Sequence, residues 1–137
     1  MIANPMVCAS FSVLIWVVYT QERAFVNEME LNVVVIGDIG IRAPESVVKQ
    51  KVVRAIELQH QDRPFRLGIN LVGNEYPDGS AKDEFVNLCW IFELSFPASM
   101  FPFDFLTVPG AVDYQGDVAT QIKYHWQEHR FYMPQKN

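Results

Sequence analysis

Three short apolar runs, two followed by a glycine and the third by Pro109-Gly110, divide the chain from residue 31 onwards. They cover residues 31–36, 65–72 and 103–108, and they are rich in β-branched and aromatic side chains. A short apolar run of about four to eight residues that stops at a turn residue is typical of a strand covered on both faces of a sheet. The sequence therefore predicts three strands.

Between and after these runs, apolar residues recur at helical spacing. A first helix is predicted from the Ala-Pro-Glu-Ser segment at residues 43–46 to about His60, because proline and an acid favour a first helical turn. The positions expected on the inner faces of the three helices are Val48, Val52, Ala55, Ile56 and Gln59, then Phe85, Leu88, Cys89 and Phe92, and then Val118, Ile122 and Trp126 after a start near Asp117. Strands that alternate with helices predict an α/β fold with a mainly parallel sheet.

Functional groups of a parallel sheet belong on the loops that leave the carboxyl ends of its strands. Three such loops are predicted, at residues 37–40, 73–76 and 110–113, and each begins with glycine. Glycine lets the backbone turn tightly, and an acid just beyond it can face a cation held above the sheet edge. Asp38 is the best placed of these acids.

The first 21 residues contain no charge, and residues 7–18 are largely apolar. Three interpretations of this leader are open: a secretory signal or signal anchor, a transmembrane segment, or a buried helix or strand of the fold. We therefore divide the chain into a leader at residues 1–24 and one domain at residues 25–137. A chain of 137 residues with 50% apolar content is long enough for one ordinary core.

Charge and cysteine content exclude several classes of function. The net charge is −5, and the eleven Lys and Arg residues form no basic run. Nucleic acid is therefore not an expected partner. The two cysteines, Cys8 and Cys89, supply neither a disulfide framework nor a CxxC metal site.

The three glycine-led loops resemble those of the tartrate-resistant type of purple acid phosphatase, a calcineurin-like metallophosphoesterase family. That family has Gly-Asp-x-Gly, Gly-Asp-Asn-Phe-Tyr and Gly-Asn-His-Asp after its first three strands. The third loop matches best, because the family's spacing continues without a gap through Gly110, Asp113, Gly116, Val118, Gln121, Ile122 and Tyr124. The aromatic and proline segment at residues 131–134 is also similar. The resemblance covers residues 31–137 and corresponds to the N-terminal half of the family's βαβα sandwich.

The resemblance implies a vestigial metal site at Asp38, Asn74 and Tyr76. Asp38 matches the first metal ligand, whereas Asn74 replaces the Asp that bridges two metal ions and carries no negative charge. Tyr76 meets the ferric-ion ligand only if one loop residue is deleted. Ala111 replaces a metal-binding Asn, and Val112 replaces the His that serves the phosphate or leaving group.

These losses imply a pseudophosphatase that acts as a structural or interaction subunit of a larger, membrane-associated or secretory assembly with protein partners. The glideosome-associated pseudophosphatases of apicomplexan parasites are similar in kind. No cofactor is expected beyond one weakly bound divalent or ferric ion, near Asp38, Tyr76 and Asp113. The alternative is a metal-dependent acid phosphatase that hydrolyses phosphomonoesters, and a third interpretation is a phosphate-binding module without turnover.

Two further features leave alternatives open. His125 and His129 have i, i+4 spacing, which suits either a metal site on a helix face or an ordinary helix end. The aromatic-rich residues 90–105 are either core or part of a partner surface. A single sheet also needs a cover on its second face, which an assembly would provide.

Overall fold

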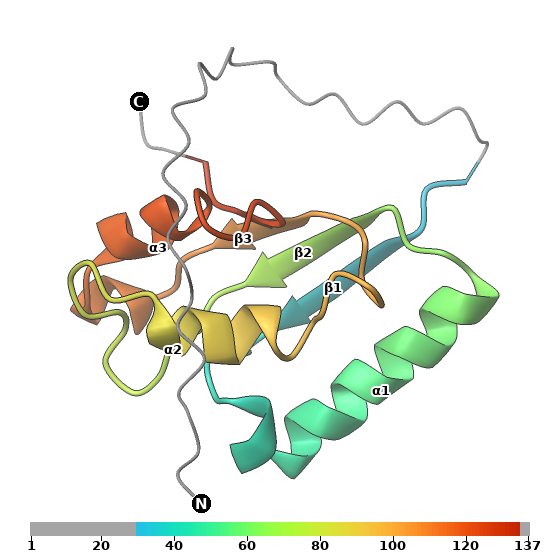
Figure 1. The fold of residues 1–137 in the computed structure, drawn as a ribbon, viewed down its shortest axis with the longest axis horizontal. Helices are drawn as coiled ribbons and strands as arrows, with labels where there is room; N and C mark the ends of the chain where they lie inside the picture. Colours follow the sequence, from blue (N-terminus) through green and yellow to red (C-terminus); the bar gives the residue numbers. More distant parts are fainter. Residues whose placement is uncertain (1–29, 135–137) are drawn as a thin grey trace, which may run out of the picture.

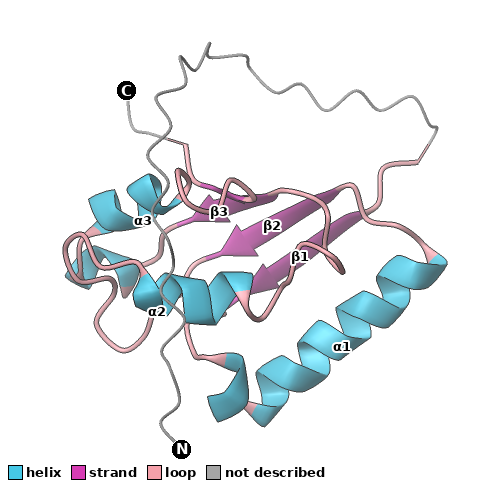
Figure 2. Cartoon of the chain, viewed as in Figure 1, coloured by secondary structure: helices cyan, strands magenta, loops and turns pink. Residues whose placement is uncertain are grey.

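A computed structural model describes residues 30–134 of the chain (Figure 1). The leader at residues 1–24 lies outside the described residues. Four strands form one sheet: β1 (Val33–Gly37), β2 (Leu67–Leu71), β3 (Phe105–Val108) and β4 (Phe131–Tyr132). The longest helix, α1 (Val47–Asp62), joins β1 to β2, and α2 (Val86–Leu88) and α3 (Val118–Tyr124) follow β2 and β3 (Figure 2). The predicted α/β class is confirmed.

The sheet is parallel throughout, and its strands lie in chain order, β1-β2-β3-β4. Each connection therefore steps in the same direction across the sheet. Because parallel crossovers are right-handed, steps in one direction place every connecting helix on the same face. The packing agrees, because side chains from α1, α2 and α3 join a single core cluster with residues from one face of the sheet.

The covered face of the sheet is centred on a row of four residues, one from each strand. Val34, Gly68, Phe105 and Phe131 are register partners and are all buried. A Cβ atom added at Gly68 would lie 2.3 Å from the ring of Phe105. Glycine is therefore required on β2 because the Phe105 ring lies across it.

The opposite face of the sheet is apolar and largely uncovered by the described residues. Its central row joins Val35, Ile69, Leu106 and Tyr132 across the four strands. Val35 is 58% exposed and Tyr132 is 45% exposed. Parallel sheets are normally covered on both faces. We call this surface the bare face, because residues 30–134 provide no layer that covers it.

The first predicted helix begins later and turns a different face inwards than its sequence indicated. Ala43–Glu45 form a separate 3₁₀ turn, and Ser46 caps α1 by accepting a hydrogen bond from the Lys49 amide at 3.2 Å. The buried residues of α1 are Lys49 and Ile56, with Val53 partly buried against the core. Of the expected inner positions, Ile56 is confirmed, whereas Val48, Val52, Ala55 and Gln59 are exposed. Lys49 displaces them because its ammonium group has partners in the interior.

Lys49 joins α1 to two other parts of the fold. Its Nζ donates hydrogen bonds to the carbonyl oxygens of Ile39 at 2.7 Å, Ile41 at 2.8 Å and Ile91 at 2.6 Å. A buried charge is tolerated when its donors are satisfied in this way. Burial nevertheless lowers the pKa of Lys49 from 10.5 to about 7.

The second predicted helix is confirmed in position but changes character after one turn. α2 continues into a π-helical turn, η2 (Cys89–Glu93), and Leu88 and Phe92 are fully buried. Most of the aromatic side chains that follow belong to the core, which was one of the two interpretations of residues 90–105. Phe96, Phe101, Phe103 and Phe105 are buried, whereas Trp90 is 44% exposed.

The third helix is short, which changes the interpretation of the residues after it. α3 ends at Tyr124, and His125 is its C-terminal cap. His125 and His129 therefore do not share a helix face, and the possible metal site on such a face is wrong. Val118 and Ile122 pack against the core as expected, but Trp126 is exposed. The fourth strand, β4, was not predicted. None of the helices among residues 30–134 is long and apolar enough to cross a membrane.

Candidate functional site

Two of the three predicted site residues meet at the carboxyl edge of the sheet. Asp38 follows β1 and Tyr76 follows β2, and the Tyr76 hydroxyl donates a 2.7 Å hydrogen bond to Asp38 Oδ1. The backbone holds the two loops together, because Gly40 N donates to Gly73 O at 2.8 Å and Tyr76 N donates to Gly40 O at 3.1 Å. Both side chains are exposed.

The backbone near this pair adopts conformations that most residues avoid. Asp38 has a φ of 53°, Val72 has 54° and Gly73 has 61°. Positive φ costs a β-branched residue such as Val72 more than it costs glycine. A Cβ atom at Gly73 would lie 2.6 Å from both Asp38 Oδ1 and the Tyr76 hydroxyl. The contact between Asp38 and Tyr76 therefore requires glycine at position 73.

The hydrogen bond changes the acid–base character of Tyr76. By stabilising the protonated phenol, the hydrogen bond to Asp38 raises the pKa of Tyr76 above its ordinary value, with smaller contributions from burial and from the negative charges of Asp38 and Asp113. Phenolate is therefore disfavoured at neutral pH. In the described structure Tyr76 acts as a hydrogen-bond donor.

Asn74, the third predicted site residue, is fully buried and engaged within the fold. Its Oδ1 accepts a hydrogen bond from Asn70 Nδ2 at 2.7 Å, and its Nδ2 donates to Gln121 Oε1 at 3.0 Å and to Val108 O at 3.4 Å. These bonds link β2, β3 and α3. The amide therefore supports the loop from within and does not join the pair of Asp38 and Tyr76.

Asp113 ties the second and third loops together. Its Oδ1 accepts hydrogen bonds from the amides of Asn74 at 2.9 Å and Glu75 at 3.2 Å and from Gln121 Nε2 at 3.0 Å. Its Oδ2 accepts from Gly110 N at 2.8 Å. The side chain is fully buried. Four donors thus occupy the carboxylate that the sequence placed near a residual cation.

The interior of the second loop holds another engaged acid. The Glu75 carboxylate is buried and accepts a 2.5 Å hydrogen bond from the Ser80 hydroxyl. Burial raises the pKa of Glu75, although hydrogen bonds from Ser80 and Asn87 oppose this shift. The Glu75 carboxylate therefore joins the two ends of the loop at residues 75–80.

The donor set does not fit a two-metal centre. A two-metal hydrolytic site needs ligands that bridge two cations and an opening for water and substrate. Of the sequence-predicted ligands at this edge, Asp38 and Tyr76 are exposed, whereas Asn74 and Asp113 are buried and engaged in internal bonds. Ala111 and Val112 carry no ligand atoms in their side chains. Across residues 30–134, no group of three or more His, Cys, Asp or Glu side chains could hold a metal ion.

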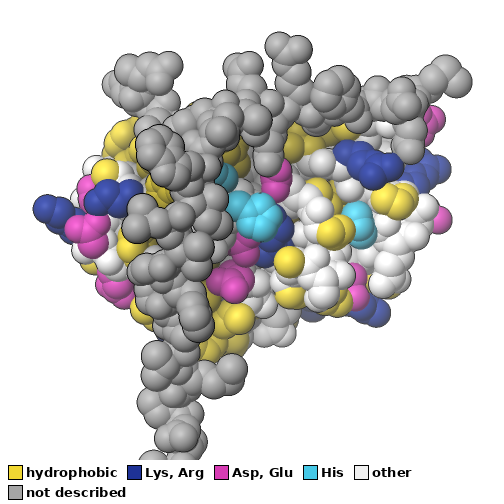
Figure 3. Space-filling model, turned by 45° about the horizontal axis from the view of Figure 1, so that its top comes forward, with side chains coloured by type: hydrophobic (Ala, Val, Ile, Leu, Met, Phe, Trp, Pro, Cys, Tyr) yellow, Lys and Arg dark blue, Asp and Glu magenta, His cyan; other side chains and the backbone are white. Residues whose placement is uncertain are grey.

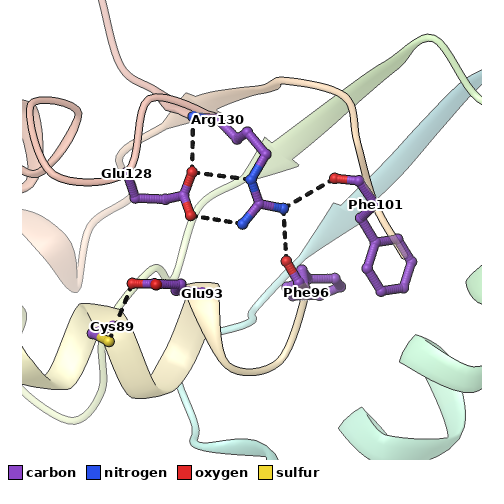
Figure 4. Close-up of polar contacts among 6 residues, drawn as sticks. All are labelled: Cys89, Glu93, Phe96, Phe101, Glu128 and Arg130. Carbon is purple, nitrogen blue, oxygen red and sulfur yellow. Dashed lines mark hydrogen bonds and ion pairs between the residues drawn. The ribbon is translucent and has the colours of Figure 1, made fainter. Parts of the chain in front are cut away.

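Sequence reasoning missed a second polar centre, which lies away from these loops. Arg130 binds both carboxylate oxygens of Glu128, through Nε at 3.0 Å and Nη2 at 2.6 Å (Figure 4). Its Nη1 donates to the carbonyl oxygens of Phe96 at 2.7 Å and Phe101 at 3.0 Å. The short Glu-His-Arg segment matches no motif, and the sequence does not show that Glu128 and Arg130 are both buried. The sequence therefore carried no signal for this pair.

The charged surface agrees with the composition. On the face shown in Figure 3, acidic and basic side chains are interspersed. A scan of protein-family models finds no match to this chain, and a search of curated proteins finds no significant match either.

Proposed function

We propose that this chain is a catalytically inactive, phosphoesterase-like protein that acts as a structural or interaction subunit with protein partners. The observation that carries the proposal is the internal engagement of Asn74 and Asp113. Asn74 takes the position of the Asp that bridges two metal ions in the resembling family, and Asp113 lies in the same loop as Ala111, which takes the position of a metal-binding Asn. Here they form a buried network that holds the loops in place.

The residue types around the site support the same conclusion. A phosphoesterase centre of this type generates a metal-bound hydroxide and clamps the phosphate oxygens. Neither step has the necessary groups, because Ala111 and Val112 cannot bind a cation or transfer a proton. Asp38 and Tyr76 remain as a hydrogen-bonded pair.

An exposed hollow beside Trp90 on the helical side supports a role in protein interaction. Trp90 and Leu94 line a hollow of about 340 Å³ together with Pro44, which lies in the 3₁₀ turn before α1. The Arg42 guanidinium lies 5.9 Å from the centre of the Trp90 ring. Trp and Arg are the residue types that most often dominate binding energy at protein interfaces.

Hydrolysis of an aryl phosphate between about pH 5 and 7 tests the proposal, because metallophosphoesterases of acid type act in this range. We expect no turnover above the uncatalysed rate, with or without added iron, zinc or manganese. The matched control is Asp38→Ala, which should be indistinguishable from the unaltered chain. A measurable rate that Asp38→Ala abolishes would overturn the proposal.

A metal-dependent acid phosphatase is the second candidate, and the contact between Asp38 and Tyr76 favours it. In the resembling family, the first-loop Asp binds one metal ion and a second-loop Tyr binds the ferric ion, and Tyr76 meets that Tyr when one loop residue is deleted. Such an enzyme would need its remaining ligands from another chain or segment. A visible charge-transfer band on addition of ferric ion, lost in Tyr76→Phe, would support this candidate.

A further inference from the structure

The bare face of the sheet is a structural feature that the proposed function does not use. Its central row, Val35, Ile69, Leu106 and Tyr132, crosses all four strands. A second row adds Leu71 and Val108, which are register partners and are both exposed. Contiguous apolar patches of this kind are normally covered in a folded protein.

We propose that residues 7–18 of the same chain pack across the bare face and form its second covering layer. This assigns the leader to the third of the interpretations open from its sequence, a buried element of the fold. The proposal is independent of the proposed function, because it concerns the side of the sheet away from the core cluster. It makes the fold a three-layer arrangement of helices, sheet and leader.

The dimensions of the leader suit this position. Strands of five residues are about 17 Å long, and a helix of the twelve residues 7–18 would be about 18 Å long. The fourteen residues 19–32 join the leader to β1 and can span about 46 Å when extended. The leader can therefore reach every strand of the sheet.

The chemistry of the two surfaces also matches. Residues 7–18 contain no charged side chain, and eight of the twelve are Val, Leu, Ile, Phe or Trp. The two rows of the bare face are built from Val, Ile, Leu and Tyr. Burying such surfaces against each other contributes roughly 25 cal/mol per Å².

A second copy of the chain is a weaker occupant than the leader. Four strands spaced about 4.8 Å apart give a face of about 250 Å², so a symmetric pair would bury about 500 Å² through this face. Stable protein interfaces bury at least about 1,200 Å² in total. The leader is also tethered, which gives it an effective concentration in the millimolar range.

Cross-linking in the full chain tests the proposal through the native thiol of Cys8. All variants carry Cys89→Ser, so that Cys8 is the remaining native thiol. Leu71→Cys places a second thiol on the bare face, and Val48→Cys places a matched one on the exposed side of α1. A short bismaleimide then joins thiols that lie close together, and circular dichroism verifies that each variant is folded.

We expect an intramolecular cross-link in Leu71→Cys, at the mass of one chain, about tenfold faster than in Val48→Cys. Adding Leu14→Asp should reduce the rate to that of Val48→Cys, because a charge cannot be buried on this face. If Leu71→Cys fails to fold, Val35→Cys replaces it.

Three results would overturn the proposal. Equal rates for Leu71→Cys and Val48→Cys would place the leader elsewhere, and a product with the mass of two chains would identify a second copy as the occupant. Loss of the cross-link when phosphatidylcholine vesicles are added, with flotation of the chain on them, would show that the leader is a membrane segment.

Discussion

At the scale of single residues, the Arg130–Glu128 pair is the most buried ion pair among residues 30–134. Burial raises the pKa of Glu128, but the hydrogen bonds and charge of Arg130 outweigh this and lower it overall. Arg130→Met should reduce the free energy of unfolding by about 3–5 kcal/mol, because it leaves a buried carboxylate unpaired. Urea denaturation followed by circular dichroism measures the change.

The exposed pair of Lys123 and Asp83 supplies the control for Arg130→Met. Lys123 Nζ lies 2.6 Å from Asp83 Oδ1, but both side chains are about half exposed. Exposed ion pairs contribute little to stability. Lys123→Met should therefore change the urea midpoint only slightly, and Glu128→Gln combined with Arg130→Met should recover part of the loss. Equal effects of Arg130→Met and Lys123→Met would contradict the buried-pair account.

Lys49 predicts a distinctive dependence of stability on pH. Its pKa is about 7 in the folded chain and 10.5 ordinarily, so between these values the unfolded chain holds a proton that the folded chain has released. Stability therefore rises with pH across this window, by at most about 1.4 kcal/mol per pH unit. Urea denaturation at pH 7, 8 and 9 should show this rise in the unaltered chain. The slope should be smaller in Lys49→Met, and equal slopes would refute the shifted pKa.

The roles of individual site residues were only partly accessible from sequence. Loop position correctly indicated that Asp38 and Tyr76 could approach each other, because both follow neighbouring strands. The internal role of Asp113 was not accessible, because two of its donors come from residues 38 and 39 positions away as well as from nearby ones. A carboxylate that accepts backbone amides leaves the same sequence signature as one that binds a cation.

At the scale of elements, the sheet depends on one close approach between β2 and β3. Gly68 leaves room for the Phe105 ring, and a methyl group there would overlap it. Gly68→Ala should therefore lower the free energy of unfolding by about 1–3 kcal/mol, as overpacking does in other cores. Thermal and urea unfolding measure this cost.

A double-mutant cycle separates overpacking from a general loss of strand stability. Phe105→Leu removes the ring, so it should be less costly in the Gly68→Ala background than in the unaltered chain. If the two costs are additive, the residues do not interact as the structure requires.

Elements were predicted with different success for physical reasons. The first three strands were found because β-branched runs bounded by glycine have few alternatives. Strand β4 has only two residues, too few for any periodicity. The inner face of α1 was predicted only in part: Ile56 is buried as expected, but Lys49 is buried as well, because it has interior hydrogen-bond partners that its sequence spacing cannot reveal. The apolar exposed positions Val48 and Val52 made the wrong face look hydrophobic.

At the scale of the whole molecule, strand order decides which surfaces are covered. Alternating elements predicted a parallel sheet, but the order β1-β2-β3-β4 follows from packing between distant residues. That order places the helices together and leaves the opposite row largely uncovered by residues 30–134, with Val35 and Tyr132 exposed and Ile69 and Leu106 half-buried. The bare face is therefore the surface that the sequence analysis expected to need a cover.

The central functional claim is that this chain lacks a two-metal centre. Elemental analysis of the full chain, purified without chelators and after incubation with iron, zinc and manganese, tests it most directly. We expect less than one tightly bound equivalent per chain, because the predicted ligands Asp38 and Tyr76 are bonded to each other and Asn74 and Asp113 are engaged internally. Any weak binding should be lost in Asp38→Ala. Two equivalents per chain that survive dialysis and depend on Asp38 would contradict the account.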